Sequence, residues 1–115
     1  MEGALWHDAA LEHDVRLIAV TRPGFAESSP LPGRTLLDWP KDVIALADHL
    51  GVERFGAMGI SGGGPYVLAC VKEIPKERLV AGGLICSVYP ATLGLSGMGM
   101  SGRICSMSLP GSLGW

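Results

Sequence analysis

The sequence predicts an α/β fold with a three-layer αβα arrangement, in which a parallel sheet lies between two layers of helices. Three apolar runs, residues 15–20, 54–60 and 79–87, lack the alternation of polar and apolar side chains that marks a strand with one solvated face. Helical patterns separate these runs, and an alternation of strands and helices along the chain is typical of parallel crossovers. The length of 115 residues suits one domain.

The first half of the chain supplies two predicted helices. Residues 4–13 form the first helix, and the run 15–20 and a loop rich in proline and glycine follow it. The second helix begins at Asp38 or Trp39, because Pro40 is tolerated in a first turn, and Gly51 ends it as a left-handed cap. Its apolar side chains form a single stripe at i, i+3, i+4 and i+7, namely Val43, Leu46, Ala47 and Leu50.

The second half supplies two predicted strands around a third helix. Residues 54–60 and 79–87 are the strands, and residues 65–74 are the helix, which Pro75 stops. Residues 91–115 are rich in glycine, serine, methionine and leucine and show neither a helical nor a strand periodicity, so they stay unassigned. One interpretation is that they begin a cap over an active site.

Composition excludes several classes of function. Eleven acidic against nine basic residues give a net charge of −2, so we expect no nucleic-acid partner, which needs a clustered basic surplus. The three cysteines show neither a disulfide framework nor metal-ligand spacing, and we expect no metal and no cofactor. We predict that Cys70, Cys86 and Cys105 are small buried hydrophobic residues in a reducing compartment.

A membrane span is the alternative for the uncharged residues 79–102. Glycines and Pro90 interrupt this stretch, which favours a buried strand followed by an irregular segment. The N-terminus carries Glu2, His7 and Asp8 where a signal peptide is apolar. We therefore expect a cytoplasmic protein without a membrane span.

The junction between the run 54–60 and the following helix holds a G-x-S-x-G motif, Gly59 to Gly63. A sharp strand-to-helix turn holds a nucleophile in a strained conformation, and small residues two positions to either side make room for it. Gly59 and Gly63 meet that demand for Ser61. The helix N-terminus presents N–H groups and the positive end of a dipole, and the N–H of Gly62 is a candidate oxyanion donor.

Together with a second segment, this motif resembles the α/β-hydrolase family, of the AB hydrolase-1 type. Residues 21–29 look like the family's R-P-G-x-G-x-S loop, with Ala26 where the second glycine is usual. The resemblance covers residues 4–90, which we predict to be the central part of such a domain with three of its usual eight strands. It implies a partial α/β-hydrolase fold and a nucleophile elbow with Ser61 as nucleophile.

The resemblance also implies parts that this chain does not carry. The family's triad runs serine, acid, histidine, but no histidine follows Ser61, and the only acids there are Glu73 and Glu77. His13 and His49 are expected at the far ends of their strands, and only His7 could approach the active face. The other oxyanion donor comes from a loop that lies upstream in the family. We therefore interpret the chain as a fragment, truncated at both ends.

Three classes of function follow. The first is a serine hydrolase of small-molecule ester or related acyl substrates, with esterases, lipases, C–C bond hydrolases and iminopeptidase-like enzymes not separated. The second is a non-catalytic truncated remnant or binding module. The third, a nucleotide-binding unit, is disfavoured because no G-x-G-x-x-G fits the glycines at 56–64. We expect the chain alone to be inactive and to self-associate through exposed sheet edges.

Overall fold

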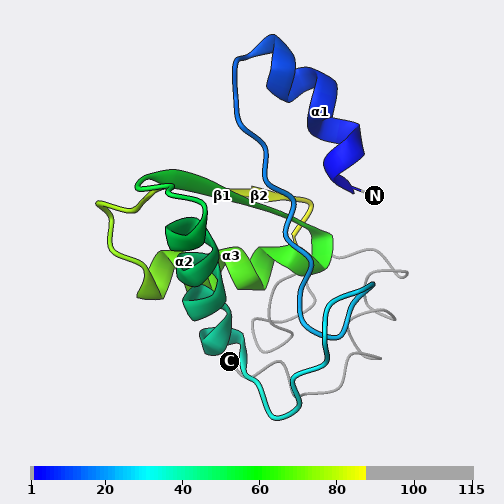
Figure 1. The fold of residues 1–115 in the computed structure, drawn as a ribbon, viewed down its shortest axis with the longest axis vertical. Helices are drawn as coiled ribbons and strands as arrows, with labels where there is room; N and C mark the ends of the chain where they lie inside the picture. Colours follow the sequence, from blue (N-terminus) through cyan, green and yellow to red (C-terminus); the bar gives the residue numbers. More distant parts are fainter. Residues whose placement is uncertain (1, 88–115) are drawn as a thin grey trace, which may run out of the picture. The chain divides into compact units, whose positions relative to one another are not determined.

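The computed structural model describes residues 2–87, and Figure 1 shows the order of their elements. These residues fall into two compact units, one ending at Gly33 and the other beginning at Arg34. The first unit holds a single helix, and the second unit holds the strands and the remaining helices. The predictions for residues 91–115 and for Cys105 lie outside the described residues.

The first unit begins with helix α1, Glu2–Glu12, which confirms the first predicted helix. The chain leaves it through Asp14, whose φ is +53°, and the Val15 N–H closes the end by donating to the Ala10 carbonyl. Residues 15–20 then run without regular structure, so the predicted strand is wrong. Apolar β-branched residues favour a strand only where another strand accepts their backbone hydrogen bonds. In this unit none does, and Val15 to Val20 lie exposed.

The second unit begins with helix α2, Trp39–His49, preceded by the short 3-10 turn Leu36–Asp38. The Asp38 carboxylate accepts hydrogen bonds from the Thr35 backbone N–H at 2.9 Å and from the Thr35 hydroxyl at 3.1 Å. Arg34 forms an ion pair with Asp42 in the first turn of α2. Gly51, with a φ of +68°, follows the last turn, which confirms the predicted left-handed cap.

Two parallel strands, β1 (Phe55–Ile60) and β2 (Leu79–Ile85), form the described sheet, and helix α3 (Gly64–Glu73) connects them. After an irregularity between Phe55 and Gly56 the register is regular to the pair Ile60 and Ile85. Helices and a parallel sheet in this unit are compatible with the predicted α/β class. The sheet has two strands among the described residues, where the sequence predicted three.

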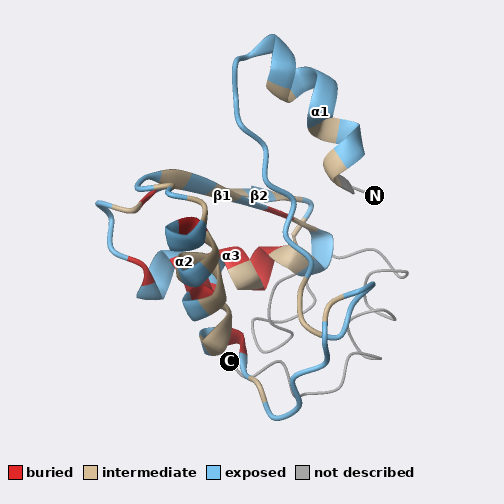
Figure 2. Ribbon diagram, in the orientation of Figure 1, coloured by how far each residue is buried: buried red, intermediate tan, exposed pale blue. Residues whose placement is uncertain are grey.

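The core of this unit lies between the sheet and its two helices (Figure 2). Helix α3 packs on both strands, and α2 packs on α3. The innermost side chains are Cys70, Ile74 and Leu79, against which Trp39, Val43, Ile44, Phe55 and Ala57 pack. The three-layer arrangement remains a prediction, because the described residues of this unit show helices α2 and α3 and a two-stranded sheet.

The two described cysteines differ. Cys70 is 1% exposed, and burial raises the pKa of its thiol to about 11, so it is a protonated, inert core residue as predicted. Cys86 is exposed, so the prediction of burial is wrong for it, because it stands one residue beyond β2. Within residues 2–87 no helix is long and apolar enough to cross a membrane.

Candidate active site

Ser61 stands at the turn between β1 and α3. Strand β1 ends at Ile60, Ser61 to Gly63 form a 3-10 turn, and α3 begins at Gly64. Ser61 is exposed and has a φ of +51°. That left-handed conformation costs a non-glycine residue about 1–2 kcal/mol. The sequence-based prediction of a tight strand-to-helix turn with unusual backbone dihedrals at Ser61 is confirmed.

Gly59 makes this turn sterically feasible. A Cβ at position 59 would lie 2.6 Å from the Gly63 carbonyl oxygen, 2.7 Å from its carbonyl carbon and 2.8 Å from Cγ2 of Val67. Two of these atoms belong to the backbone of the turn itself, so no change of rotamer could move them. Glycine at position 59 therefore lets α3 begin directly over the end of β1.

Gly63 plays a different part from the one expected. Its backbone is right-handed, with φ −78° and ψ −18°, and no described atom lies within 4 Å of a Cβ built on it. The expected steric demand is thus met at Gly59 alone, and Gly63 contributes the backbone against which Gly59 packs. The motif's two outer glycines look equivalent in the sequence, but in the structure only the first is crowded.

Gly62 follows Ser61 at the start of the helical segment, and it is exposed. Helix α3 has ten residues, and the positive end of its dipole points toward the turn. An anion formed beside Ser61 would therefore lie near unsatisfied N–H groups. In this position the Gly62 N–H is suited to the role of oxyanion donor that the sequence assigns to it.

The end of β2 lies beside this turn. Ile60 and Ile85 are paired across the sheet, so Ser61 and Cys86 leave it at the same edge. Cys86 also has a left-handed backbone, with a φ of +45°. The next residue, Ser87, lies against Gly64 at the start of α3. Ser87 was not among the predicted functional residues, and its only signal in the sequence is Gly64, the glycine directly after the motif.

The structure does not bring His49 to Ser61. His49 is the last residue of α2 and is exposed, and the chain enters β1 from that end. The six residues of β1 separate that end from Ser61. At about 3.3 Å per residue this is a distance of roughly 20 Å. His7 and His13 are exposed residues of the first unit, and their predicted relations to Ser61 stay predictions.

The predicted R-P-G-x-G-x-S loop folds back on itself in the first unit. The Ser28 N–H donates to the Phe25 carbonyl at 2.9 Å, and the Ser28 hydroxyl donates to the Thr21 carbonyl at 3.2 Å. Gly24 has a φ of +81° and Ala26 a φ of +46°. Ala26 therefore adopts the conformation that favours glycine at the very position where the family's loop usually has one.

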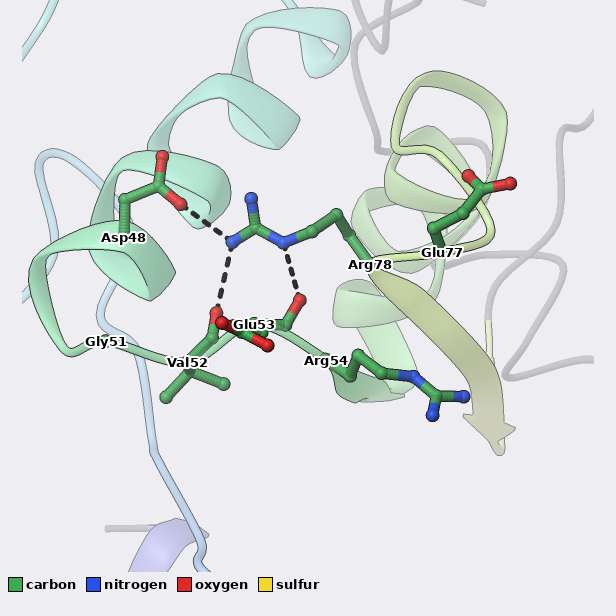
Figure 3. Close-up of a pocket in the computed structure, with 7 residues that line it drawn as sticks. All are labelled: Asp48, Gly51, Val52, Glu53, Arg54, Glu77 and Arg78. Atoms are coloured by element: carbon green, nitrogen blue, oxygen red, sulfur yellow. Dashed lines mark hydrogen bonds and ion pairs between the residues drawn. The ribbon is translucent and has the colours of Figure 1, made fainter.

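A hollow lies at the start of the strands, the opposite end from Ser61, and its lining comes from the segments that precede β1 and β2. Figure 3 shows these lining residues. The Arg78 guanidinium donates to the Asp48 carboxylate at 2.7 Å and to the carbonyls of Val52 at 3.0 Å and Glu53 at 2.6 Å. It thereby fastens the start of β2 to the segment between α2 and β1. The side chains of Arg54 and Glu77 point away from that guanidinium (Figure 3). Because the Arg78 guanidinium already donates to three acceptors of the chain itself, we assign the charged residues of this hollow a structural role and not a ligand site.

Metal ligands do not gather in the part of the chain that the structure describes. No group of three or more histidine, cysteine, aspartate or glutamate side chains within it is placed to hold an ion. Two described side chains have clearly shifted pKa values, and both shifts have structural causes. Hydrogen bonds at the start of the helical segment lower the pKa of Asp38, and burial in the core raises the pKa of Cys70.

Comparison with known proteins adds one relationship to hydrolases. The chain is similar to a protein of Bacillus subtilis (strain 168) described as the uncharacterized hydrolase YcgS, with 28% identity over 71 residues. The match covers 62% of this chain and 25% of that protein, so the chain spans about a quarter of the length of the curated relative it matches. No family model matches the sequence, and no solved structure matches it.

Proposed function

We propose that the chain carries the nucleophile elbow of a serine hydrolase of the α/β-hydrolase kind, acting on ester or related acyl substrates. The observation that carries the proposal is the positive φ of Ser61 at the turn from β1 to α3. A strained nucleophile at such a turn is the geometry that the elbow requires. The similarity to an uncharacterised hydrolase supports the same class of reaction.

In this proposal Ser61 Oγ attacks the acyl carbonyl carbon, and a base removes the hydroxyl proton as the bond forms. The carbonyl oxygen becomes an oxyanion, which the Gly62 N–H and the positive end of α3 stabilise. Collapse of the tetrahedral intermediate breaks the ester C–O bond, and the leaving oxygen takes up the proton held by the base to depart as the alcohol. Water then attacks the acyl carbon, gives a proton to the base, and releases the carboxylic acid, and Ser61 Oγ regains its proton from the base. The turn supports this chemistry because it presents Ser61 exposed at the edge of the sheet.

The base is the part of the mechanism that the residues after Ser61 do not supply, since none of them is a histidine. His49 lies at the wrong end of β1 to serve. Without a base, the serine hydroxyl stays protonated at neutral pH and is a poor nucleophile. We therefore expect little acyl transfer from these 115 residues on their own.

A fluorophosphonate probe, which reacts with activated serines, tests the proposal. The 115-residue chain should be labelled no more than its Ser61→Ala variant. A longer polypeptide that continues past Trp115 with an acid and a histidine should be labelled at Ser61, and Ser61→Ala should abolish the label. Labelling of that longer polypeptide at another residue, or none at all, would overturn the proposal.

A non-catalytic binding role is the second candidate, and the absence of histidine from residues 62–115 favours it. The same labelling experiment separates the two. A longer polypeptide whose Ser61 never reacts would assign the turn to a binding module. Ser61-dependent labelling of the 115-residue chain alone would instead support catalysis by this chain without a histidine after Ser61.

A further inference from the structure

Ser87 and Gly64 interlock at the start of α3. Gly64 is the first residue of the helix and is buried, and Ser87 is the second residue after β2. A Cβ built on Gly64 would lie 1.6 Å from Oγ of Ser87, 2.6 Å from its Cβ and 3.5 Å from its Cα. The Ser87 side chain therefore occupies the space that any larger residue at position 64 would need.

The backbone of Gly64 does not itself require glycine. Its φ of −57° and ψ of −49° are ordinary helical values, which alanine adopts without strain. The need for glycine at position 64 therefore comes from Ser87 and not from the turn. This distinguishes Gly64 from Gly59, which is crowded by the backbone of the turn.

Gly64 also connects Ser87 to the nucleophile. The Gly64 N–H donates to the Ser61 carbonyl oxygen, which closes the 3-10 turn that follows β1. A side chain that fixes Gly64 thus fixes the group that holds Ser61 in its turn. The end of β2 thereby supports the elbow at the end of β1, although Ser87 lies 26 positions after Ser61 in the sequence.

We propose that Ser87 is a positioning residue for Ser61, acting by packing its side chain on Gly64 at the first residue of α3. This inference rests on the proposed function, because positioning matters for a nucleophile. It makes two claims that can be measured on the 115-residue chain. Ser87 and Gly64 are energetically coupled, and loss of the Ser87 side chain loosens the turn ahead of the rest of the helix.

Thermal unfolding of paired variants tests the coupling. Gly64→Ala should lower the Tm by roughly 5 °C or more, because Oγ and Cβ of Ser87 would both have to move. In a Ser87→Gly background the same substitution should be neutral or raise the Tm, since the nearest remaining Ser87 atom is Cα at 3.5 Å. A Ser87→Ala background should give a partial rescue only, because Cβ stays in place.

Gly63→Ala is the matched control, since no described atom lies within 4 Å of a Cβ at that position. It should leave the Tm unchanged or raise it, whichever residue stands at position 87. If Gly64→Ala destabilises equally with serine and with glycine at position 87, the coupling is refuted. The rescue keeps the test decisive even where Gly64→Ala alone fails to fold.

Amide hydrogen exchange tests the positioning role. In Ser87→Gly the Gly64 amide, which donates to the Ser61 carbonyl oxygen, should exchange roughly tenfold faster, equivalent to about 1.4 kcal/mol, while the last turn of α3 keeps its rate. A uniform change along α3 would assign Ser87 a purely structural role and overturn the proposal. These readouts need no catalysis, so they can fail while Ser61 is labelled in the longer polypeptide, or succeed while it never is.

Discussion

Replacing Gly59 by alanine places a methyl group against the turn that carries Ser61. Ordinary contact begins near 3.4 Å, so the Gly63 carbonyl oxygen, at 2.6 Å from the new Cβ, would have to retreat by 0.8 Å. Overpacking of this kind costs about 1–3 kcal/mol, and the upper end applies because backbone atoms cannot rotate away. The lower chain entropy of alanine returns about 0.4–1 kcal/mol. We expect a net loss of about 2 kcal/mol.

Far-UV circular dichroism during heating measures this loss. For a domain of this size about 2 kcal/mol corresponds to a fall in Tm of roughly 8–16 °C. Gly62→Ala is the control, because no described atom lies within 4 Å of a Cβ there, and it should change stability by about 0.5 kcal/mol at most. A Gly59→Ala protein that melts within about 2 °C of the unsubstituted chain would refute the steric account of the turn.

Other predictions concern the cap, the strand ends and the sheet edges. Arg78→Ala should cost about 1–2 kcal/mol by urea unfolding, and Asp48→Ala less, because two of the three acceptors of Arg78 are backbone carbonyls; equal losses would contradict this. The hydrogen bond from the Thr35 backbone, with bonds from Lys41 and the Thr35 hydroxyl, lowers the pKa of Asp38 to about 2. Its stabilisation is therefore present above about pH 4 and lost as the pH falls toward 2, and Asp38→Asn should flatten the Tm over that window. Each described strand has one unpaired edge, so light scattering should show oligomers, and a monodisperse monomer would be the contrary result.

Local signals were sufficient for most of the elements. Proline in the first turn and glycine after the last one predict the bounds of α2 closely, because caps depend on neighbouring residues only. The turn at Ser61 is predictable for the same reason. The wrong strand prediction for residues 15–20 shows the limit of such reasoning. A strand needs a partner strand for its backbone hydrogen bonds, and the local sequence does not identify that partner.

The contacts between distant segments were not predictable. Ser87 packs on Gly64, and Arg78 binds Asp48, across 23 and 30 positions of sequence, respectively. Neither pair has a motif, because each joins segments that only the folded chain brings together. The equal appearance of Gly59 and Gly63 in the motif likewise conceals that only the first is crowded.

The pKa of a thiol at position 61 tests most directly whether this turn activates a nucleophile. In a Cys86→Ser background, Ser61→Cys places a thiol at the start of the helical segment, and alkylation rates resolved by peptide give its pKa. The helix N-terminus should lower that pKa below the ordinary value of about 8.5. Ser29→Cys, in an exposed loop position, is the control and should keep the ordinary value. A thiol at position 61 with a pKa equal to or above that control would contradict the assignment of Ser61 as a nucleophile.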